Sequence, residues 1–314
     1  MTADDEIECF FACRQLESFN SEIVDRYSKL IDDFMRSDAA SGGEAMRQWP
    51  SILRLSYPSF RTWDLPQMLL SLILRGFRNQ QTSDPACPHD HFCEAFSGTG
   101  NLTRECLRMG LRGSAFDWVY EAEEHNLCSS KGVRLVLDCI SGLCWHGLLW
   151  IACECSSFTV LCRAVSCRHE GNGFLGDTSR NFVATGNLLM CVSSLFYFIS
   201  YALQVYVVLE QPQNSCLQFC EPICGVFRFT GTVAFRVYLG SYGSPSVKPL
   251  SVFTTCKNIQ RLESSKAKCE SQLVTRDESG AFTGIKDELF KSQEYTASFA
   301  RCVAHLLQEE LGQH

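Results

Sequence analysis

The stretch HFCEAFSGTGNLTRECLRMG, His91 to Gly110, predicts a β-strand that turns sharply into an α-helix. Gly98 and Gly100 stand where the strand gives way to the helix, which we expect to begin at Asn101. Glycine lets the backbone turn tightly and approach a ligand, and the first N–H groups of a helix point toward that ligand. Thr103 occupies the third glycine position of the dinucleotide fingerprint, so a nucleoside other than a nicotinamide cofactor is favoured.

Two acidic residues follow this turn, each at the expected end of a strand. We predict strands over Gly113–Asp117 and Arg134–Asp138. An acid at the end of the second strand can accept the ribose hydroxyls of a nucleoside, and Trp118 offers a flat apolar face for its base. Asp138 could meet the amino group of an adenine. The alternative for both acids is a helix N-cap.

The rest of this region alternates short apolar runs with helical patterns, as in a mainly parallel sheet built from β-α units. Further strands are expected over Leu148–Cys153 and Gln204–Glu210, and helices over Tyr120–Ser129 and Thr178–Leu203. The later stretch FRVYLGSYGSPSVKPLSVFTT, Phe235 to Thr255, predicts two more strands about a Gly-Ser-Pro-Ser turn.

The chain divides into a helical N-terminal extension, residues 1–84, and an α/β domain, residues 85–314. Apolar residues recur at helical spacing over Asn20–Asp38, opposite a charged face. A second apolar helix over Leu65–Phe77 precedes NQQTSDPACPHDH, which is typical of a linker, and we place the boundary near Asp84. At the other end, a polar segment over Lys257–Lys286 leads to a last amphipathic helix over 287–311.

Composition limits the class of protein. Nineteen cysteines and an acidic opening without a signal segment favour an intracellular protein, nuclear or cytoplasmic, with mostly free thiols. The net charge of -7 argues against a broad basic surface for nucleic acid. The clusters CPHDHFC, Cys87 to Cys93, and CLQFCEPIC, Cys216 to Cys224, lack the paired C-x-x-C spacing of structural zinc sites, so we expect no metal.

One stretch raises the question of a membrane. NLLMCVSSLFYFISYALQVYVVL, Asn187 to Leu209, has no charged residue over a length that could span a bilayer. Glu210 follows at once, and no lysine or arginine appears before Arg228. A buried helix that leads into a central parallel strand would have the same composition. We favour that interpretation, and a membrane anchor is the alternative.

Four motifs in order resemble those of cytosine-5 DNA methyltransferases. They are FSGTG, Asp117 with Trp118, CECSSF and LEQP, in the positions of the cofactor turn, the adenosine-binding acid, the nucleophile loop and the Glu-Asn-Pro motif. Divergent relatives in algae and other protists are more similar, since their loop reads Pro-Cys-Ser-Ser-Phe and they carry a Tyr-Gly-x-Pro-x-x-Lys-Pro segment like SYGSPSVKP, from Ser241. The resemblance covers about Phe92 to Leu307. It implies a Rossmann-like methyltransferase fold with a mostly parallel sheet flanked by helices.

The resemblance also implies a cofactor, a substrate and roles for particular residues. S-adenosylmethionine would be the cofactor, and DNA or RNA the substrate. Cys155 would add to carbon 6 of cytosine as a thiolate, and Glu210 would assist at ring atom N3. Position in the chain, apart from the resemblance, suggests three arginines as contacts to phosphate or substrate: Arg163 and Arg168 close behind Cys155, and Arg236 near the sixth strand. The alternative for all three is a solvated surface charge. The residues expected around the cofactor are Phe96, Gly98, Gly100, Asp117, Trp118 and Asp138.

The nucleophile loop departs from the family pattern. Glu154 stands where the proline belongs if Cys155 is the nucleophile, and Cys153 matches if ACE replaces Pro-Cys-Gln. A carboxylate beside the sulfur disfavours a thiolate and raises its pKa. A protein of the same fold that binds cofactor or nucleic acid without the reaction is therefore the main alternative. The glycine-containing loop over Leu161–Asp177 is a candidate lid or a solvated loop.

Overall fold

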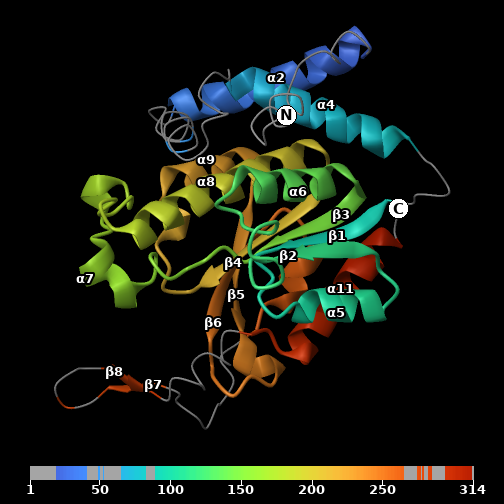
Figure 1. The fold of residues 1–314 in the computed structure, drawn as a ribbon. Helices are drawn as coiled ribbons and strands as arrows, with labels where there is room; N and C mark the ends of the chain where they lie inside the picture. The colour runs from blue at the N-terminus through green and yellow to red at the C-terminus, as the bar shows by residue number, and fades with distance from the viewer. Residues whose placement is uncertain are drawn as a thin grey trace.

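The computed structural model describes residues 19–40, 49, 52, 65–82, 89–264, 274–276, 278, 282–284 and 294–312. Their strands are β1 (Asp90–Ala95), β2 (Gly113–Phe116), β3 (Leu143–Ile151), β4 (Tyr206–Pro212), β5 (Val233–Tyr238), β6 (Pro249–Thr254), β7 (Val274–Arg276) and β8 (Phe282–Gly284). The first six form one sheet in the order β2-β1-β3-β4-β6-β5 (Figure 1), and β7 pairs with β8.

The six-stranded sheet is mixed. The neighbours β2, β1, β3 and β4 pair in parallel, as expected, whereas β6 pairs antiparallel with both β4 and β5. Two consequences follow for the position of a site. The first residues of β6 lie at the edge of the sheet where the parallel strands end. Also, β1 lies between β2 and β3, so the chain crosses over β1, and a crevice at such a reversal is where open α/β sheets bind ligands.

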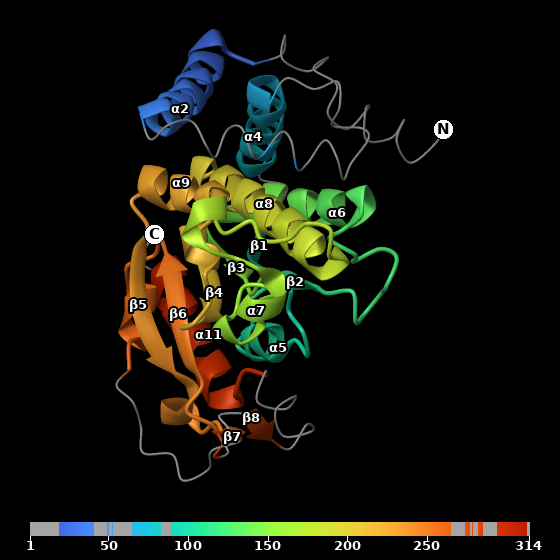
Figure 2. The ribbon, with the colours of Figure 1, turned by 90° about the vertical axis from the view of Figure 1, so that its left-hand side faces the viewer.

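Helices cover both faces of the sheet (Figure 2). On one face lie α5 (Asn101–Arg108) and α11 (Ala297–Leu311), and on the other lie α6 (Ser130–Ser141), α8 (Asn181–Ala202) and α9 (Glu221–Thr230). Short helices η3 (Val160–Cys162), α7 (Arg163–Ser166), η4 (Glu170–Asn172), η5 (Leu217–Phe219), η6 (Leu239–Tyr242) and η7 (Asn258–Leu262) lie in the connections. The model is thus an α/β protein, as the sequence predicts.

The N-terminal helices α2 (Ser21–Ala40) and α4 (Leu65–Gln81) pack as an outer layer on α6, α8 and α9. The ring centroid of Phe34 lies 4.5 Å from that of Phe198 in α8 and 5.1 Å from that of Phe229 in α9. Full burial of a phenylalanine side chain stabilises a fold by roughly 1.5–3 kcal/mol. The N-terminal extension therefore shares a hydrophobic core with the α/β domain. The expected boundary near Asp84 lies outside the described residues.

Helix α8 contains most of the uncharged run. Among the described helices it is the one long and apolar enough to cross a membrane, yet 83% of its apolar window is buried inside the protein. It leads through Leu203 and Val205, both buried, into β4. The expectation of a buried helix that feeds a central strand is confirmed. The protein's own core therefore accounts for the composition that also suggested a membrane anchor.

Two predicted elements are wrong. Residues Arg134–Asp138 belong to helix α6 rather than to a strand, because the buried side chains recur at helical spacing and the Ser129 hydroxyl accepts the Gly132 N–H at the helix start. The segment predicted as a helix over Tyr120–Ser129 forms turns instead, and the Asn126 side chain accepts the Cys128 N–H at 2.9 Å within it. The buried side chains of α6 that set the period are Val133, Val136, Leu137 and Ile140.

Candidate functional site

The glycine turn after β1 is held by an acid from the neighbouring strand end. Gly98 and Gly100 adopt left-handed φ values of 54° and 66°. The Asp117 carboxylate accepts the Gly98 N–H at 2.8 Å with one oxygen and the Val119 N–H at 3.0 Å with the other. A Cβ on Gly100 would lie 2.4 Å from the Tyr120 hydroxyl oxygen, and the φ of 66° is one that residues with a side chain rarely adopt, so both observations favour glycine there. The Tyr120 side chain thus covers the turn at Gly100, whereas Gly98 is exposed.

A pocket of 320 Å³ opens beside this turn, at the ends of the first three strands. We call it the strand-end pocket. Its walls include Phe96, Asp117 and Trp118 from the first two strand ends, Ala152 and Glu154 from the segment after β3, and Leu189 of α8. The Trp118 side chain is 67% exposed, so a face of its ring is open to a ligand. Three residues expected around the cofactor thus line one cavity.

Asp138 does not belong to this pocket. It lies in α6, where it forms ion pairs with Arg75 of α4 at 2.6 Å and with Arg134 at 3.8 Å. Burial raises its pKa, and the two arginines oppose that shift. The expectation that Asp138 contacts a cofactor is corrected here, because it rested on a strand that is a helix. The residue instead ties α6 to the outer helical layer.

Glu94 is a buried acid that the sequence analysis did not single out. One oxygen accepts the Thr103 N–H at 2.9 Å and the Thr103 hydroxyl at 2.5 Å, at the start of α5. The other oxygen, Oε1, is buried and has no hydrogen-bond partner among the described residues. Burial raises the pKa of Glu94 to about 7, against the two bonds from Thr103. A carboxyl group inside the run FCEAF was the available indication in the sequence.

Cys155 lies in the loop after β3 and is half-buried. Its carbonyl oxygen accepts the N–H groups of Phe158 and Thr159 at 2.9 and 3.1 Å, which fixes the start of the loop. Burial, followed by the charge of Glu210, raises the pKa of the thiol to about 11, and Lys248 opposes them. Glu210 therefore lies close enough to Cys155 for its charge to affect the thiol.

Glu210 is buried near the end of β4. Its Oε2 accepts the Tyr295 hydroxyl at 2.8 Å, and the same hydroxyl oxygen accepts Trp150 Nε1–H at 3.1 Å. Burial raises the pKa of Glu210, while Lys248 and the Tyr295 hydrogen bond lower it. A carboxyl group whose pKa is raised keeps its proton to a higher pH than an exposed one does, as a general acid requires.

Lys248 completes this cluster, and the antiparallel strand explains its presence. It immediately precedes β6, so it reaches the edge where β3 and β4 end. Burial lowers the pKa of Lys248, and Glu210 and Cys155 both raise it. Its φ of 28° is a left-handed value that is uncommon for a residue with a side chain. The sequence contained this residue in SYGSPSVKP but gave no indication that it meets Cys155.

Glu154 and Cys153, the two other residues of the nucleophile loop that the sequence singles out, lie in different environments. Glu154 is exposed and accepts the Ser156 hydroxyl at 2.6 Å. It contributes less to the raised pKa of Cys155 than burial and Glu210 do. Cys153 is buried, burial raises its pKa to about 12, and its carbonyl oxygen accepts Gln211 Nε2–H at 2.6 Å. Cys153 thus belongs to the core, and Cys155 is the more accessible thiol.

The three arginines expected to contact substrate lie in different settings. Arg168 is buried, and its guanidinium donates five hydrogen bonds within the protein. A guanidinium has five N–H donors, so none is left for a substrate, and Arg168 instead fixes the loop after Cys155. Arg236 is exposed on β5, at the far edge of the sheet from β1. Arg163 is exposed and lines a second pocket, described below.

The described residues form no metal-binding group. Over the described part of the chain, no three His, Cys, Asp or Glu side chains are grouped so that they could hold a metal ion, and Cys87 lies outside that part. The described cysteines are free thiols. No protein-family model, curated protein or solved structure matches this chain.

Proposed function

We propose that this protein is an S-adenosylmethionine-dependent methyltransferase of the cytosine-5 type, acting on DNA or RNA. The observation that carries the proposal is the proximity of Cys155 and Glu210, at the same edge of the sheet as the strand-end pocket. A Rossmann-like interpretation of the fold is part of this proposal. It is supported by the four parallel strands, the crossover at β1 and helices on both faces.

The residues at the glycine turn fit a nucleoside cofactor with a positively charged end. Asp117 can accept ribose hydroxyls with its remaining lone pairs, and Trp118 can stack on the base. The buried Glu94 Oε1 lacks a hydrogen-bond partner among the described residues, as expected for a carboxylate whose partner is a cationic group of a ligand. When bound, S-adenosylmethionine would supply the methyl group.

The cluster around Cys155 suits the addition chemistry. The Cys155 sulfur would form a bond to carbon 6 of the cytosine, and the Glu210 proton would pass to N3 as charge develops there. The Cys155 thiol would first give its proton to solvent. After methyl transfer, the carbon-5 proton would pass to water and leave its electron pair to the ring double bond, the carbon–sulfur bond would break with its pair going to the sulfur, and the N3 proton would return to Glu210, which restores the ring and the free cysteine. The target base must leave the nucleic-acid stack to reach a half-buried sulfur.

The first test is a calorimetric titration with S-adenosylmethionine, and the second is covalent trapping on an oligonucleotide that contains 5-fluorocytosine. The proposal predicts saturable cofactor binding and a protein–nucleic acid adduct that disappears in Cys155→Ala. Cys162→Ala, at a half-buried cysteine of the same loop region, is the matched control and should still form the adduct. Absence of any heat on titration of the wild-type protein would remove the basis of the proposal.

A second candidate function is binding of the cofactor or of nucleic acid without methyl transfer. The raised pKa of Cys155, about 11, favours it, because only about one thiol in ten thousand is ionised at pH 7. In this case the wild-type protein would bind S-adenosylmethionine and never form the adduct, and Cys155→Ala would leave both cofactor and nucleic-acid affinity unchanged.

A further inference from the structure

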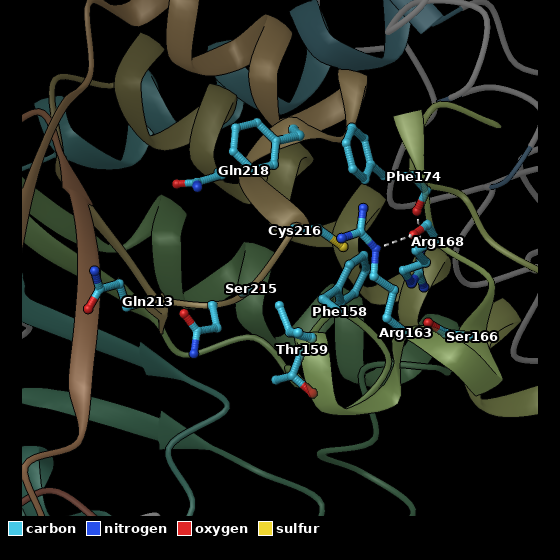
Figure 3. Close-up of a pocket in the computed structure, with 13 residues that line it drawn as sticks. Phe158, Thr159, Arg163, Ser166, Arg168, Phe174, Gln213, Ser215, Cys216 and Gln218 are labelled. Carbon is cyan, nitrogen blue, oxygen red and sulfur yellow. Dashed lines mark hydrogen bonds between the residues drawn. The ribbon is translucent and has the colours of Figure 1, made fainter. Parts of the chain in front are cut away.

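A second pocket, of 340 Å³, lies between the loop after Cys155 and the segment after β4 (Figure 3). We call it the loop pocket. The same loop carries the candidate nucleophile, since the N–H groups of Phe158 and Thr159 both bond to the Cys155 carbonyl oxygen. Thr159 also forms a β-bridge with Ser215, which joins the two walls. A ligand in the loop pocket would therefore contact the loop that carries Cys155.

One part of the lining is apolar and flat. The ring centroids of Phe174 and Phe219 lie 5.5 Å apart with 34° between the ring planes. Phe219 is 55% exposed, which is a large exposure for an aromatic side chain of this size. An aromatic face open to solvent is the surface on which unpaired nucleobases stack.

Another part of the lining can make hydrogen bonds to the edge of a base. Gln213, Asn214 and Gln218 each contribute a carboxamide, which both donates and accepts. No aspartate or glutamate is among the lining residues, although the chain carries a net charge of -7. A pocket without carboxylates in an acidic protein is a local site for an anion.

Arg163 supplies the cation of the loop pocket. Figure 3 shows its side chain extending into the pocket toward Cys216. Its Nε donates to the Arg168 carbonyl oxygen at 3.3 Å, and that is the one hydrogen bond of its guanidinium to the described residues. Arg168 is itself fixed by its five hydrogen bonds. Its carbonyl oxygen therefore holds the Arg163 side chain in one orientation. Its terminal nitrogens remain able to contact a phosphate in two-pronged geometry.

We propose that the loop pocket binds a nucleotide of the substrate strand that flanks the base held at Cys155. Its base would stack on Phe174 and Phe219, with the carboxamides at the base edge, and its phosphate would contact Arg163. The inference rests on the proposed function for the choice of nucleic acid as substrate. It adds a second point of contact, which keeps the strand in place while the target base is out of the stack.

The test is fluorescence anisotropy of a short, fluorescein-labelled single-stranded oligonucleotide with the full-length protein. We expect Phe219→Ala to weaken binding about tenfold through lost stacking. Arg163→Gln should weaken binding and lower the slope of log affinity against log salt by about 0.7, the value for one phosphate contact to a single strand. Arg261→Gln, an exposed arginine paired with Glu309, removes the same charge elsewhere and should leave both quantities unchanged.

The outcomes separate this inference from the proposed function. If neither pocket variant weakens binding more than Arg261→Gln does, or if the wild-type protein binds no oligonucleotide, the inference is overturned. Calorimetric titration of S-adenosylmethionine into the same variants should give the wild-type affinity. Failure of the wild-type protein to bind that cofactor would contradict the proposed function, and the anisotropy result for the loop pocket could still be read.

Discussion

A buried glutamate lies near the end of β1 and another near the end of β4, on the same face of the sheet. The two carboxyl groups differ in the polar and charged groups that surround them. Glu94 pairs in register with Trp150, which pairs with Val208, two residues before Glu210. Burial raises the pKa of both carboxyl groups. Glu210 has the nearby cation Lys248. Glu94 has two hydrogen bonds from Thr103, and its other oxygen has no partner within the part of the chain that the structure describes. Under the proposed function, Glu94 would face the cationic end of the cofactor at β1, and Glu210 would act as the acid at β4.

Of the substitutions at the two glutamates, Glu210→Gln should have the largest effect, and the effect should be on the rate of methyl transfer. The variant keeps the shape of the side chain but has no proton to deliver, so we expect methyl transfer to fall about a thousandfold. Affinity for S-adenosylmethionine should not change, because the strand-end pocket is intact. Single-turnover methylation rates together with calorimetry measure the two quantities. Loss of cofactor binding in this variant would contradict the division of tasks.

Glu94→Gln should change the dependence of stability on pH. The pKa of Glu94 rises from 4.5 in the unfolded chain to about 7 in the folded protein, so the folded state keeps its proton longer. The stability contribution is complete below about pH 4.5 and is lost as pH rises through about 7, a loss of about 3 kcal/mol. Glutamine does not titrate and avoids that loss.

Urea unfolding of both proteins between pH 4 and pH 8.5 checks this prediction. The free energy of unfolding of Glu94→Gln should match the wild type at the acidic end and exceed it by up to about 3 kcal/mol at the alkaline end. A constant difference across this range would mean that the Glu94 carboxyl does not titrate within it.

Tyr295→Phe removes the hydrogen bond to Glu210 at the end of β4. The hydroxyl bond from Tyr295 lowers the pKa of Glu210, so its removal should raise that pKa further. Since Glu210 would act in its protonated form, the alkaline limb of the kcat/KM profile should move to higher pH. The free energy of unfolding should fall by about 1 kcal/mol from the loss of one buried hydrogen bond. Tyr242→Phe, which loses a bond to the Leu262 carbonyl oxygen, should leave the profile in place.

Thr103→Val makes the corresponding change at β1 and should have the smallest effect. Glu94 loses the hydroxyl bond but keeps the Thr103 N–H, so the free energy of unfolding should fall by about 1 kcal/mol. The lost bond had lowered the pKa of Glu94, so the deficit should grow above pH 7. Thr99→Val, at an exposed threonine of the same turn, serves as the control. A deficit that shrinks with rising pH would reverse the assigned direction.

Much of the fold could be predicted because local patterns and glycine geometry determine it. The turn at Gly98 and Gly100, the position of Asp117 and the buried run of α8 all follow from short stretches of sequence. The helix α6 could not be distinguished from a strand by its apolar content, since Val133 and Val136 suit both. Because the segment was predicted as a strand, Asp138 was wrongly expected beside the cofactor.

The sequence by itself determined the order of the motifs and the backbone freedom of the glycine turn, because both are properties of neighbouring residues. Only the tertiary structure brought Glu210, Lys248 and Tyr295 to the loop of Cys155, since these residues are far apart in the chain and meet through the antiparallel pairing of β6 and the packing of α11. It also turned Arg168 inward and left Arg163 in a pocket. Burial and pairing across a sheet are set by long-range packing, which no local stretch of residues encodes.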